Sequence, residues 1–284
     1  MIKKILFATS GTGQNQEMLK YLLELPALQS ASITMLHVIP SKTTGKEDLT
    51  AKKEEGEKLL QDTISALKLD PNKVTTILEE GEPKDIVCKK ATELEADLII
   101  MGSRGLKRLQ SILENSVSQY VFQLTERPML LVKDDIYVKK IKRVMVAIDK
   151  SNSAQHALDV ALFMLRDTKG VQLSLVRVNP DLNKSLLPLS KEEIENNPIL
   201  APALAKARKV GIDCRGIVTG GKPSKQICNL AEENNIDLLI IGSPDRRPSV
   251  AKTLPNLERL LGSSLSDYVR VNATCPVLLA RTVE

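Results

Sequence analysis

The chain has 284 residues, enough for one large or two ordinary domains, and its 42% hydrophobic and 26% charged residues are typical of a soluble globular protein. Aromatic residues make up only 2% and the net charge is a mild +5, with acidic and basic residues interspersed. This composition argues against base-stacking platforms and basic footprints for nucleic acid. No segment approaches about 18 uncharged apolar residues, so we expect no membrane span, no signal peptide and a cytoplasmic protein.

The first part of the chain alternates strand and helix patterns. We expect strands at 3–9, 31–38, 74–78, 97–101 and 129–133, and helices at 14–25, 46–68, 83–95 and 112–124. Pro83 suits the first turn of its helix. Strands that alternate with helices in this way predict a five-stranded parallel sheet that is covered by helices and joined by right-handed crossovers.

The second part repeats the first. Matching segments, in the same order, are 4–10 with 143–149, 33–40 with 173–180, 81–83 with 221–223, 97–103 with 237–243, and 127–132 with 275–280. This order indicates a duplication, with domains at 1–134 and 140–284. Pro188, Pro198 and Pro202 should break or shorten the long helix in the second copy.

The pattern at 97–103 and 237–243 is an acidic residue, four apolar residues and then Gly-Ser. Such a run predicts a buried parallel strand, and the Gly lets backbone approach a ligand at the carboxyl end of the sheet. Asp97 and Asp237 stand at the strand starts, away from that edge, where we expect them to serve the turn.

In the first copy, Gly102-Ser-Arg-Gly105 is followed after nine residues by Asn115-Ser116. On these motifs the chain resembles a tandem universal stress protein, and the likeness covers both halves almost end to end. The resemblance implies two domains of the Rossmann-like, adenine nucleotide alpha hydrolase-like fold, packed as a pseudo-dimer. It also implies a Gly-x2-Gly-x9-Gly-Ser/Thr loop for phosphates and an Asp after the first strand for the ribose. Small residues and a Ser at a helix N-terminus suit phosphate on physical grounds as well.

Carried over by position, the resemblance gives a candidate nucleotide site in each copy. The first comprises Ser10, Gly11, Val38, Gly102, Arg104, Gly105, Asn115, Ser116 and Val117. The second comprises Asp149, Val178, Gly242, Gly262, Ser263 and Ser264.

Neither candidate site is complete. In the first copy, Asn115 replaces the third Gly and Ser10 stands at the Asp position. In the second copy Asp245, whose charge would repel phosphates, replaces the second Gly, and Tyr268 leaves a one-residue register ambiguity downstream. We therefore expect a phosphate-bearing ligand in the first copy.

Several alternatives stay open for the loop 10–14. It partly resembles a dinucleotide fingerprint, but Gln16 stands at the third Gly and no acidic residue follows the second strand. It also partly resembles the loop of ATP pyrophosphatase-type adenylating enzymes. A flexible strand-to-helix turn and a supplementary anion-binding nest are two further readings.

The leading hypothesis is a cytoplasmic stress or signalling protein that binds ATP, AMP or another adenine nucleotide, with Mg²⁺ accompanying ATP. We expect no efficient catalysis, and slow ATP hydrolysis at most, since no base or carboxylate pair for Mg²⁺ stands near the first loop. The alternative is a ligand-free, degenerate member of the family that acts as a protein-interaction module. Pairing of the two domains, a homodimer and an unknown protein partner are further expectations.

Overall fold

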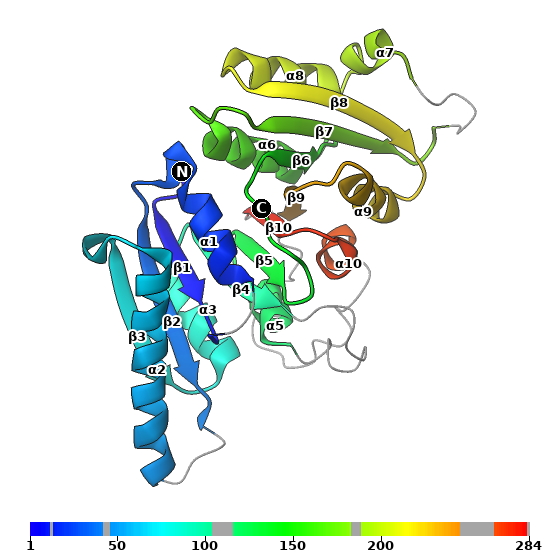
Figure 1. The fold of residues 1–284 in the computed structure, drawn as a ribbon. Coiled ribbons are helices and arrows are strands. Elements are labelled where there is room, and N and C mark those ends of the chain that lie inside the picture. The colour runs from blue at the N-terminus through cyan, green and yellow to red at the C-terminus, as the bar shows by residue number, and fades with distance from the viewer. Residues whose placement is uncertain (12–13, 42–45, 104–115, 183–188, 245–263, 283–284) are drawn as a thin grey trace. The chain divides into compact units, whose positions relative to one another are not determined.

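The computed structural model describes all residues except 12–13, 42–45, 104–115, 183–188, 245–263 and 283–284 (Figure 1). The described chain divides into two compact units. The first comprises Met1–Glu24 and Leu28–Tyr137, and the second comprises Leu25–Ala27 and Val138–Glu284.

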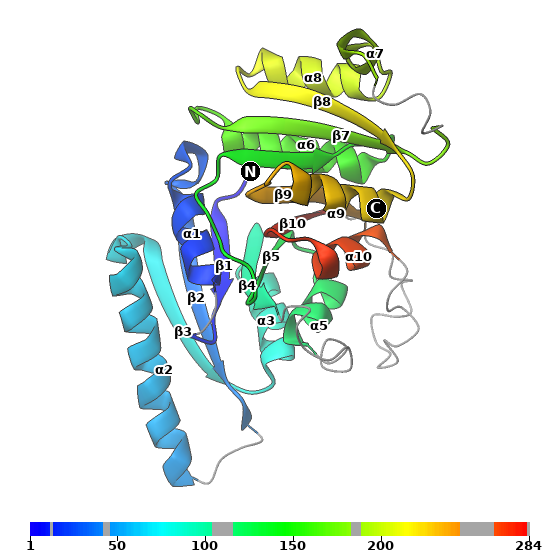
Figure 2. The same ribbon diagram turned by 45° about the vertical axis from the view of Figure 1, so that its right-hand side comes forward.

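The first unit has five strands and four helices among its described residues. They are β1 (Lys4–Ala8), α1 (Asn15–Leu23), β2 (Ser32–Ile39), α2 (Lys46–Leu67), β3 (Val74–Glu80), α3 (Pro83–Glu93), β4 (Leu98–Ser103), α5 (Val117–Leu124) and β5 (Met129–Lys133). The strands are parallel in the order β3-β2-β1-β4-β5. Helices α1 and α2 contact each other on one face of the sheet, and α3 and α5 contact each other on the other (Figures 1 and 2).

The second unit repeats this arrangement. Its elements are β6 (Arg143–Ala147), α6 (Asn152–Leu165), β7 (Gln172–Asn179), α7 (Lys191–Glu195), α8 (Leu200–Lys209), β8 (Asp213–Gly220), α9 (Pro223–Glu233), β9 (Leu238–Pro244), α10 (Leu265–Asn272) and β10 (Val277–Thr282). The parallel order is β8-β7-β6-β9-β10. The predicted alternation and the five-stranded parallel sheets are therefore confirmed.

The central strands form the core of each unit. In β4, Leu98, Ile99 and Ile100 are completely buried, and in β9, Leu238 and Leu239 are completely buried as well. Strands that are covered by helices on both faces need continuous apolar runs of this kind. The short branched side chains of the runs fill the space that aromatic residues would occupy in other cores.

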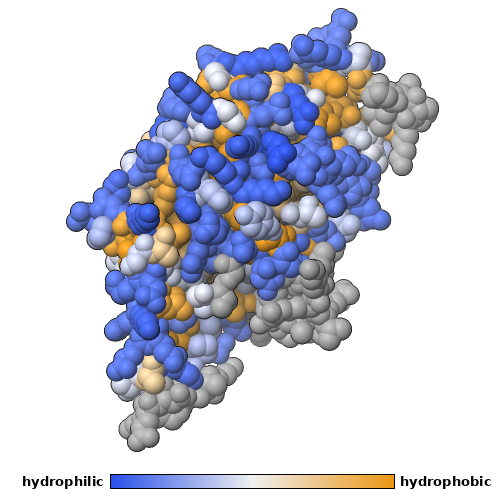
Figure 3. Space-filling view, viewed as in Figure 1, coloured by the Kyte–Doolittle hydropathy of each residue, from blue (hydrophilic) through white to orange (hydrophobic). Residues whose placement is uncertain are grey.

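The long helix α2 has a narrow buried stripe. Only Gly56, Leu60 and Thr63 are buried among its residues with described side chains, and Figure 3 shows mainly hydrophilic residues along its outer side. In the second unit, α7 and α8 replace this helix, so the predicted break at the prolines is confirmed. Pro83 and Pro223 both stand in the first turn of their helices, as the sequence predicts for Pro83.

The acidic residues before β4 and β9 fix the amino-terminal ends of the sheets. Asp97 Oδ2 accepts hydrogen bonds from the backbone N–H groups of Lys3 and Lys4, at 2.7 and 2.9 Å. Asp237 Oδ2 does the same for Lys142 and Arg143, at 3.1 and 2.8 Å, and its other oxygen also accepts from Arg143 Nη2. The expected structural role of both residues is confirmed.

The two carboxylates should differ in their contribution to stability. Asp237 is only 5% exposed, whereas Asp97 is half-buried. Asp237→Ala should lower the free energy of unfolding by about 2–3 kcal/mol, because it leaves two part-buried backbone N–H donors without their charged acceptor. Asp97→Ala is the matched control and should cost less, since water reaches its donors. Calorimetry and urea unfolding of the full chain measure the stability of both variants. Equal decreases in the free energy of unfolding would contradict the larger role given to Asp237.

Candidate functional site

A cavity of about 700 Å³ lies at the carboxyl ends of β1, β2 and β4 in the first unit. The order β2-β1-β4 reverses the direction in which the chain adds strands, and open α/β sheets bind ligands at such a reversal. We call it the switch-point cavity. Its lining includes five of the predicted site residues, namely Ser10, Val38, Gly102, Ser116 and Val117.

The β2 side of the cavity is mainly apolar. Leu36, Val38 and Ile39 line it from the strand, and Pro83 and Val87 line it from α3. Val87 and Ile39 are almost completely buried. These side chains form an apolar surface against which a planar apolar group can pack, and Lys52 and Glu55 of α2 line the cavity beside it.

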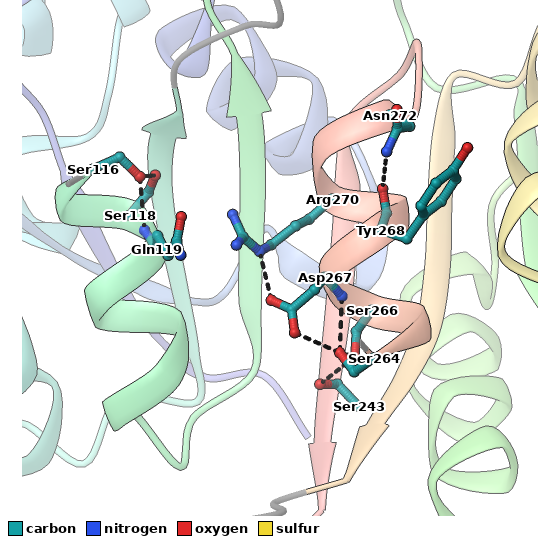
Figure 4. A network of polar contacts seen from close by, with 10 residues as sticks. All are labelled: Ser116, Ser118, Gln119, Ser243, Ser264, Ser266, Asp267, Tyr268, Arg270 and Asn272. Atoms are coloured by element: carbon teal, nitrogen blue, oxygen red, sulfur yellow. Dashed lines mark hydrogen bonds and ion pairs between the residues drawn. The ribbon is translucent and has the colours of Figure 1, made fainter. Parts of the chain in front are cut away.

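The opposite side of the cavity is the N-terminus of α5. Ser116 is the N-cap of this helix, and its hydroxyl accepts a hydrogen bond from the backbone N–H of Gln119 at 3.2 Å (Figure 4). Val117 and Ser118 follow in the first turn and also line the cavity. The first N–H groups of a helix have no partner inside it and carry the positive end of the helix dipole, so this side favours an anion.

The loop after β1 forms the floor between these two sides. Thr9 N–H donates to the carbonyl of Leu36 at 3.0 Å. His37 Nδ1 lies 2.9 Å from the carbonyl oxygen of Thr9, and because a carbonyl only accepts, Nδ1 carries the hydrogen. Gly11 adopts φ +81°, and the side chain of Leu59 occupies the place of a Cβ. Among the alternatives for the loop 10–14, the described residues fit a strand-to-helix turn that packs against Leu59. Residues 12–13 of this loop lie outside the described residues.

The remaining predicted residues of the first copy have other placements. Gly11 lines a separate hollow of about 400 Å³ beside α2 rather than the switch-point cavity. Arg104, Gly105 and Asn115 lie outside the described residues. Asn15 also lines the cavity, and sequence reasoning missed it. The alignment of the two copies could have indicated Asn15, because this polar residue aligns with the apolar Ala154.

The second unit differs at the same edge of its sheet. A Cβ on Gly242 would lie 2.5 Å from the carbonyl oxygen of Ser153 and 2.7 Å from the backbone nitrogen of Ala154. The first turn of α6 therefore packs directly onto Gly242. In the first unit, a Cβ on Gly102 would meet nothing closer than 3.9 Å. The two aligned glycines thus differ in how much room they have: a Cβ on Gly102 would be at ordinary contact distance, whereas a Cβ on Gly242 would clash with helix backbone.

Asp149 of the second unit is part of a helix cap. Its Oδ1 accepts hydrogen bonds from the backbone N–H and the hydroxyl of Ser151, which is the N-cap of α6. The same hydroxyl accepts from Ala154 N–H at 3.2 Å. This carboxylate is exposed and has a local structural role in holding the start of α6. Val178 is buried in β7.

The start of α10 resolves the register of the second copy. Ser264 is its N-cap, as Ser116 is for α5, so Tyr268 aligns with Tyr120. Asp267 then stands where the first unit has Gln119, and it accepts from the Ser264 hydroxyl at 2.7 Å and from Arg270 Nε at 3.2 Å (Figure 4). Gly262, Ser263 and Asp245 lie outside the described residues.

A largely buried ion pair therefore links Asp267, in the first turn of α10, to Arg270, in its last turn. Burial lowers the pKa of Arg270, while the neighbouring Asp267 carboxylate raises it and so favours the charged form. A carboxylate in this turn already uses the positive end of the helix dipole. The aligned turn of α5 has the neutral Gln119 at that position, and the described first turn of this helix contains no acidic side chain.

The two aligned glycines provide a direct test of these environments. Gly242→Ala should destabilise the protein by about 1–3 kcal/mol, because the new methyl group meets backbone that cannot rotate away. Gly102→Ala should change the stability by less than about 0.5 kcal/mol, since the atoms nearest to its Cβ would lie 3.9 Å away, at ordinary van der Waals distance. Thermal and denaturant unfolding of the full chain compare the two variants. A Gly242→Ala protein as stable as the Gly102→Ala protein would show that α6 does not pack on this glycine.

Comparison with known proteins agrees with this two-unit architecture. Universal stress protein YxiE of Bacillus subtilis is 28% identical over 154 residues, covering 49% of this chain and 98% of that protein. Universal stress protein MJ0577 of Methanocaldococcus jannaschii is 27% identical over 155 residues, covering 47% and 96%. The crystal structure of a universal stress protein from Archaeoglobus fulgidus has the same fold over 99% of this chain and 97% of its own, with a TM-score of 0.74 and 24% identity.

Along the described chain, no helix combines the length and the apolar character that a membrane crossing requires. The family model of the universal stress proteins matches twice, over residues 1–133 and 140–281. Together with the repeated parallel sheets, these two matches show that the chain belongs to the universal stress protein family and carries two domains of it in tandem.

Proposed function

We propose that the first unit binds an adenine nucleotide, ATP or AMP, in the switch-point cavity, and that this binding serves stress signalling without efficient catalysis. The observation that carries the proposal is the cavity itself. Its volume of about 700 Å³ lies within the usual range of about 300–1,000 Å³ for small-molecule sites. It has an apolar wall at one side and the N-terminus of α5 at the other.

The two sides suit the two ends of a nucleotide. A planar base would lie against Val38 and the side chains of α3, where little water competes for its faces. A phosphate would lie at Ser116 and Val117, where backbone N–H groups and the helix dipole favour negative charge. Gly102, without a side chain, leaves room for the ligand between them.

The proposal assigns no catalytic residue. His37 is the histidine in the lining, and its Nδ1 is engaged with the carbonyl of Thr9. The described residues contain no group of three or more His, Cys, Asp or Glu side chains arranged to hold a metal ion. Mg²⁺ would therefore arrive with ATP and be held chiefly by the phosphates, as this ion commonly is.

A second candidate function concerns the second unit. The packing of α6 on Gly242 and the buried pair of Asp267 and Arg270 support a ligand-free domain there. Such a domain would serve as an interaction module, as the alternative hypothesis holds for a degenerate member of the family. The cytoplasmic location, the pairing of the two domains, a homodimer and an unknown protein partner stay predictions.

Substitution of Gly102 tests the proposed nucleotide site. In Gly102→Glu a carboxylate enters the cavity and repels the phosphates, so the affinity for AMP and ATP should fall by more than tenfold. Gly102→Gln is the matched control, with the same size but no charge, and should retain more affinity than the Glu variant. Isothermal titration calorimetry at two salt concentrations measures both. If the Glu variant binds as the unmodified chain does, the ligand lies elsewhere.

A further inference from the structure

The second strand of the first unit continues past the end of the first strand. β1 ends at Ala8, which pairs with Leu36, whereas β2 continues to Ile39. Within the described chain, the pairing of β2 with β1 therefore stops before His37. His37, Val38 and Ile39 all line the switch-point cavity. A ligand in the cavity thus meets the end of β2 along its open side.

Successive side chains at this end of β2 point to opposite faces of the sheet. Val38 pairs with Glu79, whose carboxylate forms an ion pair with a lysine of α3, so this pair lies on the α3 face. His37 pairs with Leu78, and a Cβ on Gly56 of α2 would lie 3.1 Å from the His37 ring and 2.7 Å from Leu78. The imidazole therefore stands on the α2 face, opposite the apolar wall that Val38 and α3 provide.

The imidazole of His37 presents an accessible acceptor to the cavity. Its Nδ1 carries the hydrogen and donates to the carbonyl oxygen of Thr9 at 2.9 Å, so Nε2 of the neutral ring has a free lone pair and accepts. Nε2 takes no part in a hydrogen bond between described residues, and it is not one of the enclosed side-chain atoms that lack a partner there. Because the ring is half-buried and lines the cavity, a ligand can reach this nitrogen.

The chemistry of an adenine base matches this acceptor. In an adenine nucleotide the ring nitrogens of the base accept hydrogen bonds, and the exocyclic amino group is its donor. The apolar wall for the base lies on the other side of the same strand segment, which brings the base beside the imidazole. Nε2 is therefore suited to the amino group, whereas a phosphate would place acceptor against acceptor.

The other polar groups on the α2 side are less suited to this role. Lys52 only donates, and the carboxylate of Glu55 belongs to an exposed residue, so water competes for it. Thr9 Oγ1 already accepts from a backbone N–H at 3.0 Å. In the second unit, Arg177 stands at the position aligned with His37, and a guanidinium cannot accept. The acceptor is thus a feature of the first unit.

We propose, on the basis of the proposed function, that His37 is a specificity-determining residue of the first unit. Its Nε2 accepts a hydrogen bond from the exocyclic amino group of the base, while its Nδ1 holds the ring against the loop after β1. The cavity therefore selects a 6-aminopurine nucleotide over one that lacks the amino group.

The test compares AMP with purine riboside 5′-monophosphate, which has a hydrogen in place of the amino group. Calorimetry on the full chain at pH 8, where imidazole side chains are generally neutral, measures both affinities. The unmodified chain should bind AMP about three- to tenfold more tightly, as one hydrogen bond provides. His37→Asn keeps an amide donor near the position of Nδ1 but has no atom at Nε2, so the preference should fall below about twofold. Circular dichroism and the melting temperature check its folding.

Two further variants separate the possible roles. His37→Gln places its amide near the position of Nε2 and loses the donor to Thr9, so it should keep more of the preference than His37→Asn. Glu55→Gln changes the other acceptor on the α2 side and should leave the preference unchanged. A loss of preference in Glu55→Gln alone would assign the amino group to Glu55 and overturn the inference.

Nitrogen NMR of the unmodified chain gives a readout that depends on no variant. AMP should shift the Nε2 resonance of His37, the purine analogue should shift it much less, and His156, the other histidine of the chain, is the internal reference. Equal shifts, or equal affinities of the unmodified chain for the two nucleotides, overturn the inference while the proposed function stands. If neither nucleotide binds, the proposed function fails as well.

Discussion

The position of β1 between β2 and β4 is the constraint on which the site depends. Because the chain adds β2 and β3 on one side of β1 and β4 and β5 on the other, the loops that leave β1 and β4 diverge at the carboxyl edge. Between the diverging loops lies the switch-point cavity, and the backbone of the loop after β1 forms its base. The apolar centre of the sheet keeps this edge rigid, since Phe7 and Ile100 are completely buried beneath it. Asp97 fixes the same two strands at their other end.

The second unit has the same strand order but a different edge, and the difference begins in a short segment. α6 begins at Asn152, capped by Ser151, whereas α1 begins at Asn15, two residues later in the alignment. The earlier start brings helix backbone against Gly242. The hydrogen bonds of Asp149 and Ser151 cap the helix whose backbone lies beside this glycine. One sheet architecture thus supports two different surfaces.

Much of this architecture could be predicted from the sequence. Apolar runs such as Leu98–Ile100, the repeated order of segments and the prolines in the 181–206 region determine the strands, the duplication and the broken helix. Ser116 was predictable as a helix cap because a Ser before an apolar run is a typical start signal. The resemblance to the family also placed five of the nine residues of its first-copy site on the cavity.

What escaped prediction depends on distances in three dimensions. Gly102 and Gly242 have the same sequence context, but only the structure shows that one lies beside a cavity and the other against α6. Asn15 reads as an ordinary polar residue at a helix start until its burial and its unpaired oxygen are known. The family position predicted Asp149 as a ribose acceptor, whereas its hydrogen bonds to Ser151 depend on the loop conformation.

The packing of α6 on Gly242 also bears on how such a protein would respond to its ligand. If nucleotide binds in the first unit alone, as proposed, each chain would hold one molecule, and the occupancy of independent chains would follow a simple hyperbola with a Hill coefficient of one. The fraction of chains with bound nucleotide would then rise gradually over a wide range of nucleotide concentration, as in a sensor with a graded response. A threshold switch would need a second coupled site, and the helix backbone over this glycine stands where that site would begin.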